Sequence, residues 1–347
     1  MIILKKVLSL LLVLCIAIGI FSVTATAADD AVADAAMAKL QKLDVDSNGS
    51  ISTADASMYL KAAAGIIDTS EADYDFDADG SVSVLDAQKV LRVVAGVDSP
   101  ISQEEALALF NGKLNSVKTV RPGFQKTETI QCPSALVTTS GAPLPSLNVT
   151  NLEFDKYVDK VTDILGSFMD QSQVNEMKQQ AKELYLPQVA TKTVAKASNS
   201  HYTYFPVNNL GWSSKLTTAD IKSATCSIVG GDFVCTVTLG EYTYVGNEYP
   251  TGSAGFSKRQ ALPYGKVFNI ASLDESDGST VNKVQFKNGK IVLKADIITG
   301  DVLMVDYSYT YICDILAAPQ PKSDMVMKTI TTANVTDNYV MNRVTVN

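Results

Sequence analysis

The sequence predicts a multidomain protein. An all-α part built from paired loop–helix repeats is followed by an α+β domain with an antiparallel sheet and packed helices. Two observations predict this class. Between residues 28 and 99 the chain repeats one loop-and-helix pattern. After residue 100, helical periodicity gives way to alternating apolar runs separated by turn residues, which is typical of sequential antiparallel strands.

The N-terminus has the composition of a secretory signal. Lys5 and Lys6 precede an apolar run from Val7 to Phe21, and Ala25-Thr26-Ala27 places small residues where a signal peptidase cuts. We therefore expect residues 1–27 to be removed and the mature chain to be exported. No later run reaches the roughly 18 apolar residues that a bilayer span needs, so we expect no membrane span.

Residues 44–55 and 75–86 form two twelve-residue loops that start 31 positions apart. Each loop has aspartate or asparagine at positions 1, 3 and 5, glycine at position 6 and aspartate at position 12. Alternate side chains of a tight loop can converge on one point, and Ca²⁺ prefers about six to eight oxygen ligands. The glycine permits the sharp turn that this convergence needs. The pattern therefore predicts two calcium sites.

A helix of about ten residues is expected after each loop. Asp55-Ala56 and Asp86-Ala87 are followed, at equal offsets, by leucine, a basic residue, alanine and glycine. Gly65 and Gly96 are good left-handed caps for these helices. Only nine residues separate Gly65 from Asp75, too few for a long helix that enters the second loop.

The duplicated loop with its exiting helix, and with aspartate in place of glutamate at position 12, closely resembles the type I dockerin module over residues 36–98. This resemblance implies two structural Ca²⁺ ions and, as partner, a cohesin domain of a bacterial scaffold protein. It implies as ligands Asp44, Asp46, Asn48, Ser50 and Asp55 in the first loop, and Asp75, Asp77, Asp79, Ser81 and Asp86 in the second.

The resemblance also places the partner-binding residues at loop positions 10 and 11 and on the following helix. The second half is the more apolar, so we expect Val84, Leu85 and Leu91 to form the centre of the interface, with Arg92 at its edge. We do not expect equal binding in two orientations. The implied set is Thr53, Ala54, Leu60 and Lys61 in the first half, and Val84, Leu85, Leu91 and Arg92 in the second.

Charge is concentrated in the repeats. Residues 28–99 contain 14 acidic and 5 basic residues, a net charge of −9, while the whole chain carries −8. Crowded carboxylates should repel one another without a metal, so we expect this part to be poorly folded in chelator. No basic stripe occurs, and we therefore expect no nucleic-acid partner.

Residues 101–347 are expected to form an α+β domain of unrecognised function that begins with helices. Capping boxes at Ser102–Glu105 and Thr150–Glu153 begin two of them, and a third is expected over 172–185. Residues 124–149 indicate strand and loop. Later strands are predicted at 223–239, 283–298, 302–316 and 325–346, with hairpin signals at Asn288-Gly289 and Thr299-Gly300-Asp301.

A two-residue turn at Gly230-Gly231 would place Cys226 opposite Cys235 at a non-hydrogen-bonded position, where strands approach most closely. A disulfide between these cysteines is then possible in an exported protein. The alternative is two reduced, half-buried thiols.

No catalytic motif is recognised. His201, the only histidine, has no motif around it, and we expect it to be exposed or at a strand edge. Seven tyrosines alternate with other residues, which predicts rows of rings on a strand face. Such rows either stack on sugar rings or pack within the sheet. They are Tyr202 and Tyr204; Tyr242 and Tyr244; and Tyr307, Tyr309 and Tyr311.

The leading functional hypothesis is a secreted protein that binds a cohesin on a bacterial cell-surface or extracellular scaffold through its calcium loops. It would display a non-catalytic or uncharacterised C-terminal region in a polysaccharide-degrading assembly. The alternative is a hydrolase acting on plant polysaccharide or protein, with glycosidic bonds as the first substrate class. A free calcium sensor or buffer is disfavoured, because we expect the loops to lack entering helices and because aspartate stands at position 12 of each.

Overall fold

The computed structural model describes residues 31–68, 74–140, 147–150, 170–185, 188–205, 213–249, 262–267, 280–316 and 326–341. The expected signal peptide lies outside these residues, as does nearly all of the helix expected to begin at the Thr150 capping box. Within the described part of the chain, no helix is both long and apolar enough to cross a bilayer.

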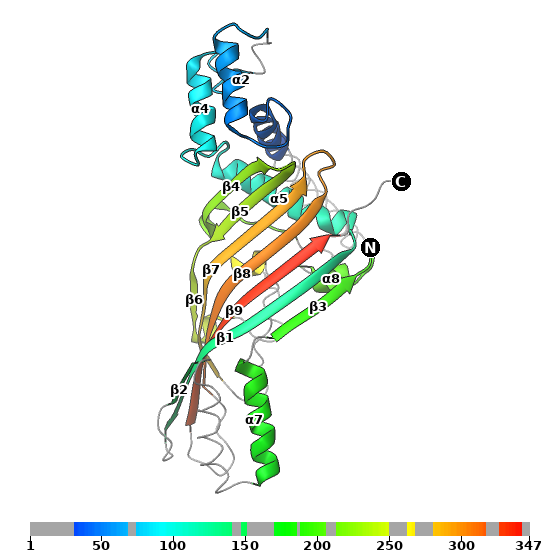
Figure 1. Cartoon of the computed structure of the whole chain (residues 1–347). Helices are drawn as coiled ribbons and strands as arrows, with labels where there is room; N and C mark the ends of the chain where they lie inside the picture. The colour runs from blue at the N-terminus through cyan, green and yellow to red at the C-terminus, as the bar shows by residue number, and fades with distance from the viewer. Residues whose placement is uncertain are drawn as a thin grey trace, which may run out of the picture. The chain divides into compact units, whose positions relative to one another are not determined.

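One nine-stranded sheet dominates the structure (Figure 1). Its strand order is β2-β1-β9-β8-β7-β5-β4, with β3 also paired to β1 and β6 to β7. The strands are β1 (Phe124–Ser140), β2 (Leu147–Thr150), β3 (Gln188–Val194), β4 (Ile221–Val229), β5 (Asp232–Leu239), β6 (Tyr242–Val245), β7 (Thr280–Asp296), β8 (Val302–Leu316) and β9 (Val326–Met341).

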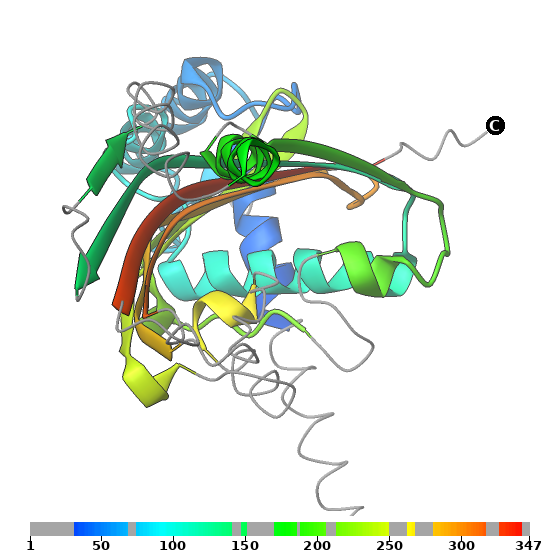
Figure 2. The same cartoon turned by 90° about the horizontal axis from the view of Figure 1, so that it is seen from below.

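The longest strands pair antiparallel in the middle of the sheet. The C-terminal strand β9 lies between β1 and β8, so the beginning and the end of the sheet-forming sequence become neighbours. Seen from below, these strands form one curved layer (Figure 2). Side chains two apart on one strand share a face, and directly paired residues on neighbouring strands do the same. This register brings together residues from sequence segments about 200 positions apart.

The described residues also form several helices. A helix over residues 31–43 leads into the first loop, so the expectation that entering helices are missing is wrong for this loop. The capping box expected at Ser102 begins α5: Ser102 N–H donates to Glu105 Oε2 at 2.8 Å, and Glu105 N–H to Ser102 Oγ at 3.2 Å. The principal helices are α2 (Thr53–Ala63), α4 (Val84–Val94), α5 (Gln103–Val120), α7 (Gln171–Tyr185) and α8 (His201–Tyr204).

The predicted fold class is wrong. The structure has one large antiparallel sheet accompanied by a few helices, rather than an all-α part followed by an α+β domain. The chain divides into two compact units, and the loop–helix repeats belong to a unit that also contains residues 224–235 and 295–301. The second unit contains 117–223, 236–294 and 302–347. Contacts between segments this far apart in sequence leave no local pattern, which is why the sequence suggested two consecutive domains.

In the first unit, α2 and α4 bury matching residues. Ala56 and Tyr59 of α2 correspond to Ala87 and Val90 of α4, and all four are almost completely buried. Leu43 and Tyr74 complete this core cluster. Each helix therefore uses one face for packing and leaves its other face to solvent.

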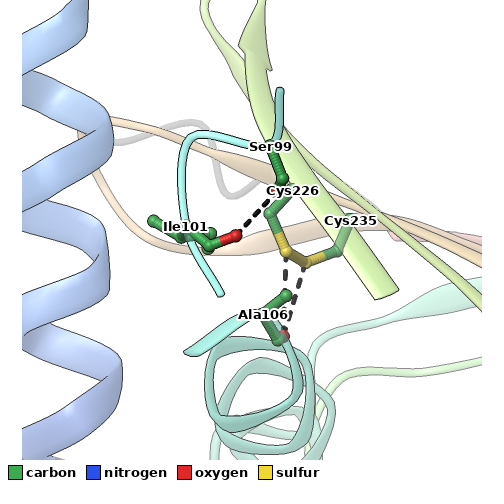
Figure 3. Close-up of a disulfide and its surroundings, with 5 residues drawn as sticks. All are labelled: Ser99, Ile101, Ala106, Cys226 and Cys235. Atoms are coloured by element: carbon green, nitrogen blue, oxygen red, sulfur yellow. Dashed lines mark hydrogen bonds between the residues drawn. A yellow bond between two sulfur atoms is a disulfide. The ribbon is translucent and has the colours of Figure 1, made fainter. Parts of the chain in front are cut away.

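The β4–β5 turn also belongs to this unit. Gly230 and Gly231 have φ values of 61° and 81°, as a two-residue hairpin turn of the type favoured by strand twist requires. Cys226 and Cys235 form a disulfide across the hairpin, with Cα atoms 4.1 Å apart. Figure 3 shows both sulfur atoms beside the Ala106 carbonyl of α5, at 3.7 and 3.8 Å.

In the second unit, aromatic rings make much of the core. Tyr264 stacks on Phe286 with ring centroids 5.0 Å apart, and Tyr244, Tyr309 and Tyr311 surround Phe286 at 5.6–6.3 Å. Three of the predicted tyrosine rings are therefore half-buried packing partners. Tyr202 and Tyr204 do not form a strand row, because they lie in the short helix α8.

The hairpin predicted at Asn288-Gly289 is also wrong, because β7 continues through both residues. Asn288 adopts a left-handed φ of 54°, which marks a local irregularity within the strand. The Gly289 N–H donates to Tyr264 Oη at 3.1 Å. A Cβ at Gly289 would lie only 2.5 Å from that oxygen. Glycine is present here because the tyrosine ring approaches the backbone.

We therefore expect Gly289→Ala to destabilise the protein by about 2 kcal/mol, because the added methyl must displace a buried ring. Urea unfolding followed by tyrosine fluorescence measures this change. In a Tyr264→Phe background the hydroxyl is absent, so the same substitution should cost less. An unchanged unfolding midpoint for Gly289→Ala would contradict the close approach.

Candidate functional site

The two twelve-residue loops have the same backbone conformation. Left-handed residues occur at loop positions 4 and 6 of both: Ser47 (φ 54°) and Gly49 (φ 84°) in the first, and Ala78 (φ 57°) and Gly80 (φ 86°) in the second. A repeat of two uncommon φ values at identical positions indicates that both loops follow one path. Each loop turns back on itself and brings alternate side chains to its inner side.

Hydrogen bonds within the loops are repeated as well. In the first loop, Asp44 Oδ2 accepts from Gly49 N–H at 2.9 Å and Asp55 Oδ2 accepts from Ser52 N–H at 2.8 Å. The equivalent bonds in the second loop have the same lengths, from Gly80 to Asp75 and from Ser83 to Asp86. These bonds hold the carboxylates of the first and last loop residues so that both face the inside of the loop.

Asp55 and Asp86 have two roles in this geometry. Each is completely buried and closes the capping box at the start of its helix, α2 or α4. The other carboxylate oxygen accepts from the backbone N–H at loop position 3, Asp46 at 3.3 Å or Asp77 at 3.2 Å. One side chain therefore fixes both the loop and the beginning of the helix.

Three carboxylates converge in each loop. One oxygen from each of Asp44, Asp46 and Asp55 lies within 4.8 Å of the others, and the same holds for Asp75, Asp77 and Asp86. These clusters of acidic residues can hold a metal ion. The same loops contain the remaining implied ligands, Asn48, Ser50, Asp79 and Ser81. The Ser50 N–H donates to Asn48 Oδ1, and the Ser81 N–H donates to Asp79 Oδ1.

Asp44 fits a bound cation. Its Oδ1 is buried, and among the described residues it has no hydrogen-bond partner. Burial raises the pKa of this carboxyl, and repulsion from Asp55 and Asp46 adds to the rise, while the N–H of Gly49 opposes it. A positive charge inside the loop would satisfy the orphan oxygen and reverse the repulsion.

The predicted partner-binding residues lie on the outer faces of α2 and α4. Val84, Leu85 and Leu91 are 63%, 57% and 41% exposed. Leu60 of α2 is exposed to the same extent as Leu91. Thr53, Ala54 and Lys61 are also exposed.

Arg92 lies at the edge of this face, where its Nε and Nη2 bind the Asp98 carboxylate at 2.6 and 2.8 Å. An open cleft of about 440 Å³ lies beside it, lined by Asp77, Leu85, Gln88, Lys89, Arg92 and Asp98.

The second unit contains a carboxyl pair that no sequence pattern indicates. Glu128 of β1 and Asp337 of β9 are direct cross-strand partners, and Tyr307 of β8 is the next partner in the same row. Lys126 Nζ lies 2.6 Å from Glu128 Oε2 and 3.3 Å from Asp337 Oδ1. Burial raises the pKa of Asp337 to about 6, Lys126 opposes the rise, and Glu128 adds to it.

His201 is not exposed, contrary to expectation. It is 2% exposed, and its ring meets the Phe124 ring edge-on at 4.8 Å. Its Nε2 contacts the Pro122 carbonyl. Burial lowers the pKa of His201, so the neutral ring is favoured. The surroundings are those of a structural core histidine.

Asp337→Asn is expected to flatten part of the pH dependence of stability. Between the ordinary carboxyl pKa near 3.8 and about 6, the folded state holds a proton that the unfolded state has lost. Wild-type stability therefore falls as pH rises through this window, by on the order of 2 kcal/mol. Asparagine cannot ionise and should remove this fall.

Urea unfolding of both proteins at pH 4.5 and 7.5 measures the difference. His201 contributes the opposite slope, because a buried neutral ring loses stability as pH falls, but it is present in both proteins and cancels. An equal loss of stability for Asp337→Asn at both pH values would contradict the assignment.

Comparisons with known proteins give no independent indication of identity. No family model matches the chain, and no curated protein or solved structure is detectably similar to it. What the protein does is accordingly inferred from its two loops, its exposed helix faces and its carboxyl pair.

Proposed function

We propose that the protein binds one Ca²⁺ ion in each loop and, in that form, binds a cohesin domain of a bacterial scaffold. The duplication carries this proposal. Two loops share their left-handed positions, their internal hydrogen bonds and their three converging carboxylates. Each begins a helix whose outer face is exposed and, in the second half, largely apolar.

The donor set favours calcium over other divalent ions. The loops offer only oxygen, since neither contains cysteine or histidine, and this disfavours zinc and copper. Carboxylates from positions 1, 3 and 12, the side chain at position 5 and a serine carbonyl at position 7 supply the several ligands that Ca²⁺ accepts in flexible geometry. Mg²⁺ demands a stricter octahedron and keeps more of its water.

Calcium would act structurally. Ca²⁺ would neutralise the repulsion among three carboxylates in each loop and so stabilise the capped starts of α2 and α4. The orientation of the exposed helix faces depends on those starts. Removal of metal should therefore abolish partner binding by loosening the helix pair rather than by removing a contact.

The second half is the proposed centre of the interface. Val84, Leu85 and Leu91 present large apolar side chains to solvent, and the cleft beside Leu85 can receive a side chain of the partner. The pair formed by Arg92 and Asp98 lies at the rim, where charge contributes more to specificity than to affinity.

In this proposal the chain is exported and attached to an extracellular scaffold, and it displays its sheet-containing part within a polysaccharide-degrading assembly. The N-terminal residues 1–27, which resemble a secretory signal, support export.

Binding of the mature chain to a panel of immobilised cohesins, in CaCl₂ and in EGTA, tests the proposal. We expect calcium-dependent capture by at least one cohesin. Leu91→Ala and Val84→Ala should each weaken binding by about tenfold or more. Their first-half counterparts, Leu60→Ala and Thr53→Ala, serve as matched controls with smaller effects. Equal losses in both halves would contradict the assigned centre, and capture in EGTA would contradict the role of calcium.

A second candidate, a hydrolase acting on glycosidic bonds, is favoured by Glu128 and Asp337. Glycosidases use two neighbouring carboxyl groups, one of them with a raised pKa as general acid. Asp337 has such a raised pKa, and both carboxyl groups lie against one lysine. Lys126 partly neutralises the pair, which weighs against this candidate.

Activity of the mature chain on glucans, xylans, starch, pectin and casein tests this candidate. Turnover that Glu128→Gln and Asp337→Asn each reduce by about a thousandfold or more would support it. We expect no such turnover if the protein only binds and displays. Activity that both variants retain would remove this pair from consideration.

A further inference from the structure

The first loop is connected to a distant hairpin by three hydrogen bonds. Ile51 N–H donates to the Ile228 carbonyl at 3.3 Å, and Gly231 N–H donates to the Gly49 carbonyl at 2.5 Å. Gly230 N–H donates to Ser50 Oγ at 2.8 Å. These bonds join loop positions 6, 7 and 8 to the β4–β5 hairpin, all within one compact unit.

The contact is too close for any other residue at loop position 6. A Cβ at Gly49 would lie 2.8 Å from the Gly231 backbone. The turn is itself fixed, because the disulfide closes the hairpin behind it and Ile297 N–H donates to the Gly231 carbonyl at 3.3 Å. The first loop is thus braced by an element whose conformation is already restricted.

The second loop has a different environment. Ser81 Oγ, at the position equivalent to Ser50, donates to Asp79 Oδ1 of its own loop at 2.7 Å. Among the described residues, Val82, the counterpart of Ile51, makes no backbone hydrogen bond to another segment. Within the described part of the chain, the second loop therefore has no hydrogen bonds to a distant hairpin like those of the first loop.

In the second loop, a lysine side chain pairs with one of the loop carboxylates. Lys89 Nζ lies 2.7 Å from Asp77 Oδ2, one of the three converging carboxylates. The equivalent residue of the first half is Met58, which has no charge. A metal entering the second loop must compete with this ammonium and afterwards lie near it.

We infer that the two loops bind metal with unequal affinity. The first is a pre-organised site coupled to the disulfide-closed β4–β5 hairpin. The second has a lower affinity, because Lys89 competes with the metal for Asp77. This inference rests on the proposed calcium binding. A braced loop loses less conformational freedom when it binds. A lysine that pairs with a ligand carboxylate weakens the binding of a divalent cation, because its ammonium competes for the carboxylate and repels the cation.

Coupling of this kind must act in both directions. Metal in the first loop should stabilise the β4–β5 turn, and an intact hairpin should tighten the first site. Lys89 should affect only the second site. The two halves of the inference can therefore be separated by variants.

The test is a CaCl₂ titration of the chelator-stripped, oxidised mature chain, with calorimetry and amide NMR. The Gly49 and Gly80 amides each donate to the position-1 aspartate of their own loop and report its occupancy. We expect the Gly49 resonance to respond first, with a dissociation constant at least about tenfold below that of Gly80. Calcium should also slow exchange of the Gly231 amide.

Lys89→Met, which copies Met58, should tighten the second step by about fivefold and leave the first unchanged. Ser50→Ala removes the side-chain acceptor for Gly230 but keeps the serine position's carbonyl, and it should weaken the first step severalfold. Ser81→Ala is its matched control. Cys226→Ser with Cys235→Ser should weaken the first step about tenfold. If this double variant fails to fold, Ser50→Ala still tests whether contact with the hairpin tightens the first site.

Equal affinities that do not respond to Lys89→Met or Ser50→Ala would overturn this inference and leave the proposed calcium binding intact. Absence of any calcium uptake would overturn the proposed function and this inference together.

Discussion

The buried aspartate at position 12 of each loop is the contact on which the first unit depends. Asp55 and Asp86 accept bonds from the loop backbone with one oxygen and cap a helix with the other. A buried carboxylate is costly unless it is fully paired. Loop shape, helix start and the convergence of the other two carboxylates are therefore parts of one arrangement. Exposure of the apolar helix faces follows from it, because the opposite faces pack on the shared core of α2 and α4.

The second unit is organised by a different constraint, the register of its long strands. β9 between β1 and β8 aligns Glu128, Asp337 and Tyr307 in one row, with Lys126 between the carboxyl groups. A charge row of this kind is tolerated in a mostly buried sheet because the ammonium is shared and one carboxyl retains a proton more readily than usual. Aromatic packing around Phe286 fills the neighbouring part of the sheet.

Local features were readable from the sequence, whereas long-range ones were not. The Ser102 capping box begins α5, the run 302–316 is β8, and the glycine pair at 230 and 231 forms the tight turn. The pair Asn288-Gly289 wrongly indicated a hairpin turn, because glycine is required there by the close approach of the Tyr264 ring. The row formed by Glu128 and Asp337 depends on a register set by residues about 200 positions apart, for which no local pattern exists.

The bond between Gly230 and Ser50 spans 180 positions of the chain. A polypeptide that emerges N-terminus first presents its first loop long before the hairpin that completes it. Until residues 228–231 have been synthesised, the backbone groups of the first loop must bond to water. The three hydrogen bonds to the hairpin can form only after the long intervening chain segment has been closed. The first acidic loop is thus held by a turn that is synthesised about 180 residues later, so the final shape of this loop depends on the arrival of the C-terminal half.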